Sequence, residues 1–250
     1  MLIELQDHLT HLTLAPAVGG SIVNWRVRAS GQPLLRPSDQ AALDTGLPGK
    51  LACYPLAPWS NRIANGGFDT PAGWLALTPN SLTDPLPIHG SAWQQAWRVV
   101  SQSADEVLLA LECATPFAYR AEQRFRLRNG ELSIALRVTH LAEQAAWHGL
   151  GLHPYLPRLP ATRLQAKASQ VWLSDASKLP TGLAAVPHAW DFQASKTSPK
   201  TWWTTVFPSG TGIAGSNSRS WVMPWNARPR APITSCCTAR RGWGSFASSR

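Results

Sequence analysis

The chain has 250 residues, of which 44% are hydrophobic and 15% are charged, as in a globular protein with few charges that can bury a core of useful size. The formal net charge of +9 is unevenly distributed: residues 196–250 hold eight Lys or Arg and no Asp or Glu, whereas residues 1–195 hold 15 basic and 14 acidic side chains. Because the basicity belongs to the end of the chain, it does not indicate a nucleic-acid-binding domain.

Targeting and membrane patterns are also missing from the sequence. The first residues contain no basic segment followed by an apolar run, and no stretch is apolar for long enough to cross a bilayer. The four cysteines show no metal-ligand spacing. We expect a cytoplasmic protein with no membrane or nucleic-acid partner.

Short runs of alternating apolar and polar residues, separated by turn residues, dominate the first three quarters of the chain. They predict strands at residues 11–16, 18–25, 97–101, 106–113, 119–127 and 131–138. Asn129-Gly130 suits a two-residue hairpin turn between the last two, since both residues tolerate a positive φ. With 21 prolines and no sustained helical period, the pattern indicates an all-β sandwich or barrel.

The character of the sequence changes after about Lys196. Strand alternation fades, acidic residues end, and five tryptophans lie among Ser, Arg, Pro and Gly. We therefore divide the chain into a domain of residues 1–195 and a divergent basic segment of residues 196–250. A disordered tail is one interpretation of this segment, but disordered tails are usually poor in aromatic residues.

Two clusters of residues precede the middle of the chain. In residues 58–68, Arg62 lies between a Ser-Asn pair and a Gly-Gly turn, and in residues 87–97, His89 precedes a glycine and two tryptophans. Taken alone, such an arginine is more often a solvated surface group, and such a histidine is more often a core residue.

The third cluster is His148-Gly-Leu-Gly-Leu-His-Pro-Tyr155. Pro154 keeps the backbone of His153 extended, so Tyr155 is expected to face the same side as His153 two residues earlier. A histidine fixed in this way suits proton transfer, because its intrinsic pKa lies near neutrality.

In this order, the clusters resemble the aldose 1-epimerase family, and more closely its short bacterial branch. The resemblance covers roughly the first three quarters of the chain. The matching residues are Asn61-Arg62-Ile63, Gly67-Phe68, Asn80, His89-Gly90, Trp93, Trp97 and Gly151-Leu-His-Pro-Tyr155.

The resemblance implies an antiparallel β-supersandwich of the galactose mutarotase type, which agrees with the strand pattern. It also implies an isomerase of carbohydrate metabolism that interconverts the α and β anomers of a free aldose. In this reaction a base takes the proton of the C1 hydroxyl, an acid protonates the ring oxygen, and the ring opens and recloses. No metal or cofactor is needed.

The site residues follow from the resemblance. His153 would be the general acid, and His89 would hold and polarise the region of the ring oxygen. Arg62, Asn61 and Tyr155 would bind the sugar.

The end of the chain departs from the family pattern. The family's base is a glutamate near the C-terminus, and a substrate-binding aspartate precedes it in an Asp-Asn-x-Phe segment. This chain has no Glu after Glu143 and no acidic residue after Asp191. Asp191 matches a different position of the family, so the resemblance implies an enzyme impaired by the absence of its base.

Codon arithmetic suggests a reason for the departure. Read one base earlier, the codons of Trp202-Trp203-Thr204 force Val-Asp and allow Leu-Val-Asp-Asn-Cys-Phe, which resembles the missing aspartate segment. The same shift lets residues 247–250 encode Phe-Glu-Pro, which resembles the segment of the base. We therefore hypothesise that the chain from about Lys196 onward is translated in a shifted frame.

Three other functions remain open. A catalytically silent sugar-binding β-sandwich would keep the sugar site without the base. A hexose-6-phosphate mutarotase would need a basic cluster for the phosphate, which Arg62 alone does not supply. A nucleic-acid binder would have to use residues 196–250.

Overall fold

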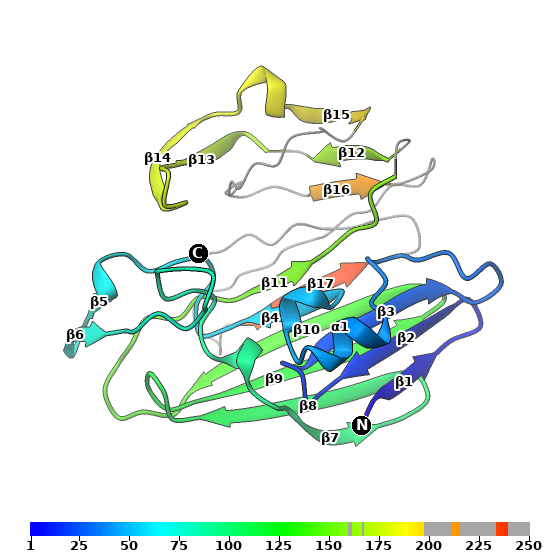
Figure 1. Ribbon diagram of the computed structural model, residues 1–250, viewed down its shortest axis with the longest axis horizontal. Coiled ribbons are helices and arrows are strands. Elements are labelled where there is room, and N and C mark those ends of the chain that lie inside the picture. The colour runs from blue at the N-terminus through cyan, green and yellow to red at the C-terminus, as the bar shows by residue number, and fades with distance from the viewer. Residues whose placement is uncertain (160–161, 167, 198–211, 216–233, 240–250) are drawn as a thin grey trace.

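The computed structural model describes residues 1–159, 162–166, 168–197, 212–215 and 234–239. Its framework is two antiparallel five-stranded sheets (Figure 1). The first sheet has the order β1-β2-β3-β4-β11, with the bounds Ile3–Gln6, Thr10–Ala15, Ser21–Val27, Cys53–Leu56 and Gly151–Pro154. The second has the order β17-β10-β9-β8-β7, with the bounds Thr234–Ala239, Glu131–His140, Tyr119–Arg128, Glu106–Cys113 and Arg98–Gln102.

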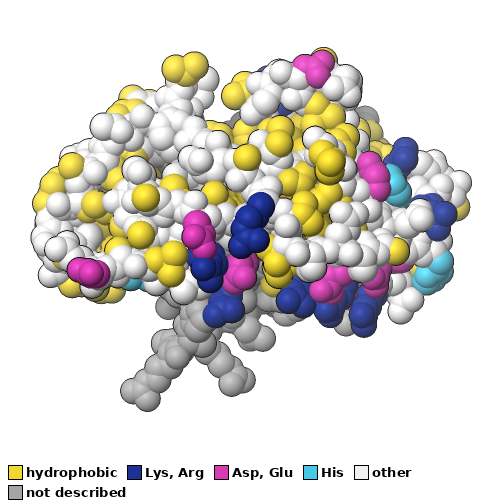
Figure 2. Space-filling view, turned by 90° about the horizontal axis from the view of Figure 1, so that it is seen from below, with side chains coloured by type: hydrophobic (Ala, Val, Ile, Leu, Met, Phe, Trp, Pro, Cys, Tyr) yellow, Lys and Arg dark blue, Asp and Glu magenta, His cyan; other side chains and the backbone are white. Residues whose placement is uncertain are grey.

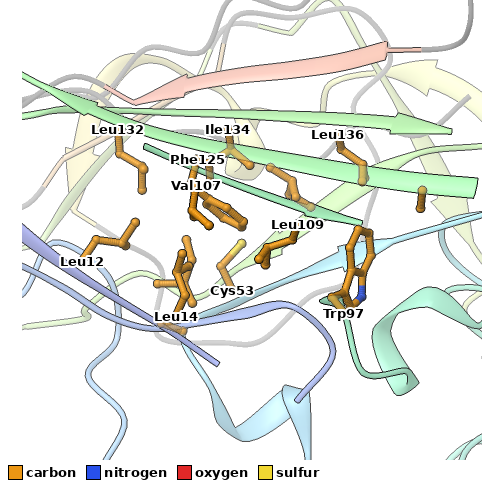
Figure 3. Close-up of a cluster of buried hydrophobic side chains, with 14 of the residues drawn as sticks. Leu12, Leu14, Cys53, Trp97, Val107, Leu109, Phe125, Leu132, Ile134 and Leu136 are labelled. Carbon is orange, nitrogen blue, oxygen red and sulfur yellow. The ribbon is translucent and has the colours of Figure 1, made fainter. Parts of the chain in front are cut away.

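The main hydrophobic core lies between these two sheets. Figure 3 shows Leu12, Leu14 and Cys53 of the first sheet facing side chains of the second sheet, among them Phe125 and Leu136. Each buried Leu or Phe side chain contributes about 1.5–3 kcal/mol relative to exposure. The antiparallel β-sandwich expected from the sequence is therefore confirmed.

The long hairpin of β9 and β10 shows how the sequence sets the register. Residues of β9 alternate between buried and more exposed positions along the whole strand, as the alternation of Arg with Phe125 and Leu127 predicts. Arg128 pairs with Glu131, and the intervening Asn129 and Gly130 have φ of 52° and 75°. The predicted two-residue turn is confirmed, because both of its residues occupy the left-handed region.

The outer face of β8–β10 is charged but balanced. Arg120 pairs with Glu112, and Arg124 and Arg126 both pair with Glu106. In the view of Figure 2, basic and acidic side chains lie next to each other in the same way. Exposed ion pairs of this kind each contribute about 0–1 kcal/mol to the free energy of unfolding, so these pairs add little to stability.

Smaller elements complete the described chain. Above β11 in Figure 1 lie a sheet of order β15-β12-β16 and the hairpin β13–β14, while the hairpin β5–β6 projects at one side. The strand bounds are Gly67–Thr70 (β5), Gly73–Ala76 (β6), Arg163–Ala166 (β12), Gln170–Ser174 (β13), Pro180–Ala185 (β14), Phe192–Thr197 (β15) and Gly212–Gly215 (β16). The helical segments are α1 (Gln40–Asp44) and the 3-10 turns Pro48–Lys50, Ala64–Gly66, Ala92–Gln94 and His188–Trp190.

Within the described ranges, no helix is long and apolar enough to cross a membrane. The division of the chain near residue 195 remains a prediction. Of the segment 196–250, strand β16 pairs with β12 and strand β17 pairs with β10. The residues on which the frame-shift hypothesis depends, 202–204 and 247–250, lie outside the described residues.

Candidate active site

A pair of stacked rings is fixed where β4 and β11 run side by side. The register places His153 opposite Tyr54, and the two rings stack with centroids 4.8 Å apart and planes 14° apart. All four residues of β4 are buried, so the sheet holds Tyr54 firmly and Tyr54 in turn fixes one face of the His153 imidazole.

Tyr155 lies beside His153, as the sequence predicts. Their ring centroids are 4.8 Å apart, and a hydrogen bond between the side chains of Tyr54 and Tyr155 closes the group. Arg36 lies over the Tyr155 ring at 3.7 Å, and its Nη2 donates to the carbonyl oxygens of Gly49 and Leu51 at 2.9 and 2.6 Å. The guanidinium of Arg36 therefore serves as a support behind Tyr155.

His89 is held by the backbone of Asn61. The N–H of His89 donates to the carbonyl oxygen of Asn61 (2.9 Å), and the N–H of Asn61 donates to Nδ1 of His89 (3.1 Å). Because Nδ1 accepts a hydrogen bond, the neutral imidazole carries its proton on Nε2. The structure thus presents a ring N–H donor in a fixed direction.

The loop that carries His89 is clamped by an amide side chain. Nδ2 of Asn80 donates to the carbonyl oxygens of Ile88 and Gly90, both at 2.8 Å, and Oδ1 of Asn80 accepts from the N–H of Ile88 at 2.7 Å. These bonds hold His89 at a φ of 62°, in the left-handed region. Such a conformation costs about 1–3 kcal/mol and persists because its surroundings impose it.

The two histidines meet at right angles. Their ring centroids are 5.6 Å apart with planes at 75°, and both side chains are half-buried. Burial, the neighbouring His153 and the charge of Arg62 lower the pKa of His89 to about 3. Burial is also the main cause that lowers the pKa of His153. Both imidazoles are therefore neutral near pH 7.

Arg62 is engaged with a carboxylate that sequence reasoning did not single out. Nε and Nη2 of Arg62 lie 2.7 and 2.5 Å from Oδ2 of Asp84, while Nη1 lies 3.4 Å from Oδ1 of Asn61. Burial opposes ionisation of Asp84, but hydrogen bonds from Arg62 and from the N–H of Leu86 outweigh it and lower the pKa of this carboxyl.

All five residues predicted from the sequence therefore lie in one contiguous group: His89, His153, Tyr155, Asn61 and Arg62. The structure adds Tyr54, Arg36 and Asp84, which sequence reasoning missed, and Trp93, whose ring lies 5.6 Å from that of Tyr54. Among the residues that the structure describes, no group of three or more His, Cys, Asp and Glu side chains could hold a metal ion.

The neutral histidines lead to a pH-dependent stability. The unfolded chain binds protons at His89 and His148 below about pH 6.5, whereas the folded chain holds their pKa at about 3 and about 4. The stability that depends on these two histidines being neutral is fully present above about pH 6.5 and is lost as the pH falls toward their folded-state pKa values. We expect His89 to lower the free energy of unfolding by about 2 kcal/mol between pH 7 and pH 5, and His148, which is more exposed to solvent, to lower it by less.

Urea denaturation at both pH values measures this change. The His89→Gln variant should show a smaller pH dependence than the parent. An unchanged pH dependence in His89→Gln would show that His89 is not held neutral.

The chain is similar in sequence to known proteins of one family. The sequence pattern of the family described as aldose 1-epimerase matches residues 1–207. The chain is 33% identical over 184 residues to the uncharacterised protein YphB of Escherichia coli K12, which covers 73% of this chain and 62% of YphB. It is 28% identical over 137 residues to YihR of the same organism, with 51% and 44% covered. It thus spans less than two thirds of the length of either relative.

Solved structures show the same fold. A provisionally assigned aldose 1-epimerase of E. coli K12 superposes with a TM-score of 0.82 at 25% identity, with 100% of this chain and 97% of the other covered. A Caenorhabditis elegans homologue of GalM and aldose epimerases superposes with a TM-score of 0.68 at 16% identity, with 99% and 94% covered. At the lower identity, the similarity concerns the fold alone.

Proposed function

The chain belongs to the aldose 1-epimerase family, and from this premise we propose that it binds a free aldose at the His89–His153 group and interconverts the α and β anomers. The paired imidazoles, 5.6 Å apart and held by independent parts of the fold, are the observation that carries this proposal. Opening a hemiacetal ring needs a proton donor at the ring oxygen and a proton acceptor at the C1 hydroxyl.

We assign the donor role to His153. Burial lowers its pKa, so its imidazolium gives up a proton readily once it forms. Tyr54 on one face and Tyr155 beside it restrict the ring to one orientation. His89 donates from Nε2 toward the ring oxygen, because Asn61 occupies Nδ1. Arg62, Asn61 and Tyr155 bind sugar hydroxyls.

The acceptor role has no matching glutamate in this chain, since Glu143 is its last. Asp84 is the carboxylate whose charge acts on His89, but its ion pair with Arg62 lowers its pKa and makes it a weak base. We therefore propose that the chain binds aldoses and exchanges their anomers slowly.

Titration with D-galactose, followed by tryptophan fluorescence, tests binding, because Trp93 lies against Tyr54 and His89. Polarimetry of freshly dissolved α-D-galactose at high protein concentration tests exchange. The His153→Asn variant should reduce exchange to the uncatalysed rate, whereas His11→Asn, a change on β2, should leave it unaltered.

The outcomes separate the candidate functions. Binding without exchange would identify a silent sugar-binding sandwich. The absence of both binding and exchange would contradict the proposal as a whole.

A further inference from the structure

The pair formed by Arg62 and Asp84 is the most enclosed ion pair of the described chain. Their side chains are 10% and 11% exposed, whereas the side chains of the other ion pairs are 21% or more exposed. Both Nε and Nη2 of Arg62 point at one oxygen of Asp84, and the other oxygen accepts from the N–H of Leu86 at 3.2 Å. The carboxylate of Asp84 is therefore fixed by the backbone N–H of Leu86 and in turn fixes the guanidinium of Arg62.

The pair is adjacent to the histidine group. Arg62 and Ile88 form an antiparallel bridge. Next to it, the N–H of His89 donates to the carbonyl oxygen of Asn61, and the N–H of Asn61 donates to Nδ1 of the His89 side chain. The charges of Arg62 and Asp84 act on His89 in opposite directions, so their fields partly cancel where a sugar would bind. Two further cations act on this region. Arg36 is turned to two carbonyl oxygens and to the ring of Tyr155, and the charge of Lys178 acts on Asp84.

We propose that Asp84 is a specificity-determining residue, which keeps this site selective for uncharged aldoses over anionic ones by pairing with Arg62. The inference deepens the proposed function and rests on it, because it takes Arg62 to contact sugar hydroxyls.

The physical argument concerns what Arg62 could do alone. A partly buried guanidinium with free Nε and Nη2 groups is a strong bidentate site for phosphate or carboxylate. With Asp84 in place these two donors are occupied, and an arriving anion would also meet the carboxylate's negative charge. The remaining N–H groups lie on Nη1 and Nη2, and Nη1 lies 3.4 Å from Oδ1 of Asn61. With the charge of Arg62 balanced by Asp84, these donors suit neutral hydroxyls.

The test compares dissociation constants for D-galactose, D-galactose 6-phosphate and D-galacturonate, measured by calorimetry on the full chain at low ionic strength. The parent should bind the neutral sugar best. In Asp84→Asn, we expect affinity for the anions relative to galactose to rise by about tenfold or more, and to fall again with added salt. Asp84→Glu keeps the charge and should keep the parent's preference.

Glu112→Gln is the matched control. It removes one negative charge and releases Arg120, which binds Glu112 through Nε and Nη2 at 2.8 and 2.6 Å on the exposed face of the second sheet. Its preference should equal the parent's. Circular dichroism of each variant establishes that it is folded.

Three results would overturn the inference. Galactose binding by the parent together with an unchanged preference in folded Asp84→Asn would overturn the role of Asp84 alone. If Asp84→Asn does not fold, loss of the neutral preference in Asp84→Glu, which retains the charge, would overturn it equally. Failure of the parent to bind any of the three sugars would overturn the proposed function, and this inference with it.

Discussion

A version of the chain in which residues 196–250 are replaced by the one-base-shifted translation should exchange the anomers of galactose roughly 10²–10⁴ times faster than the chain itself. The shifted frame permits a Glu-Pro segment that resembles the family's base, whereas the chain has no glutamate after Glu143. A positioned base contributes this factor because it removes the C1 hydroxyl proton while the ring bond breaks. Polarimetry of freshly dissolved α-D-glucose and α-D-galactose measures the two rates side by side.

The donor on the other side of the ring supplies the control for this comparison. In the version with the shifted translation, changing His153 to Asn should remove the increase in rate, since the base alone leaves the ring oxygen without its acid. Equal rates for the chain and for the version with the shifted translation would mean that another group takes the C1 proton. The frame shift would then have no functional consequence.

Strands β9 and β10 of the second sheet could be predicted because their residues alternate between buried and more exposed positions. The alternation in β9 and the Asn129-Gly130 turn determine the hairpin and its register locally. Strand β4 shows no such alternation, since all four residues are buried and Pro55 interrupts the apolar pattern. Its pairing with β11 is long-range, so nothing near Tyr54 in the sequence indicates that it stacks on His153.

The site shows the same division between local and long-range information. Resemblance to the family indicated all five predicted site residues, and the spacing of Tyr155 from His153 indicated in addition that the two side chains face the same side. Asp84 lies outside any strand and matters only because the chain folds its loop onto Arg62. For Asn61, the structure shows a contact that the sequence did not indicate, since its backbone N–H holds His89.

Gly90→Ala should lower the free energy of unfolding by more than about 4 kcal/mol. Gly90 has a φ of +69°, and a Cβ there would lie 2.1 Å from the carbonyl oxygen of Ala57. The same residue accepts hydrogen bonds at its carbonyl oxygen from Asn80 and from Nε1 of Trp93. Relief of the clash must move this segment, and with it His89, so sugar binding should be lost together with stability.

Gly46→Ala separates the cost of the clash from the cost of the backbone conformation. Gly46 has a φ of +63°, but a Cβ there meets no atom within 4 Å, so the substitution should cost only about 1–2 kcal/mol. Urea denaturation and galactose titration of both variants measure the difference. If Gly90→Ala costs no more than Gly46→Ala and still binds galactose, the contact with Ala57 is not what fixes His89. The orientation of the His89 imidazole would then depend on the hydrogen bonds of Asn61 and Asn80. These bonds can persist when the loop shifts.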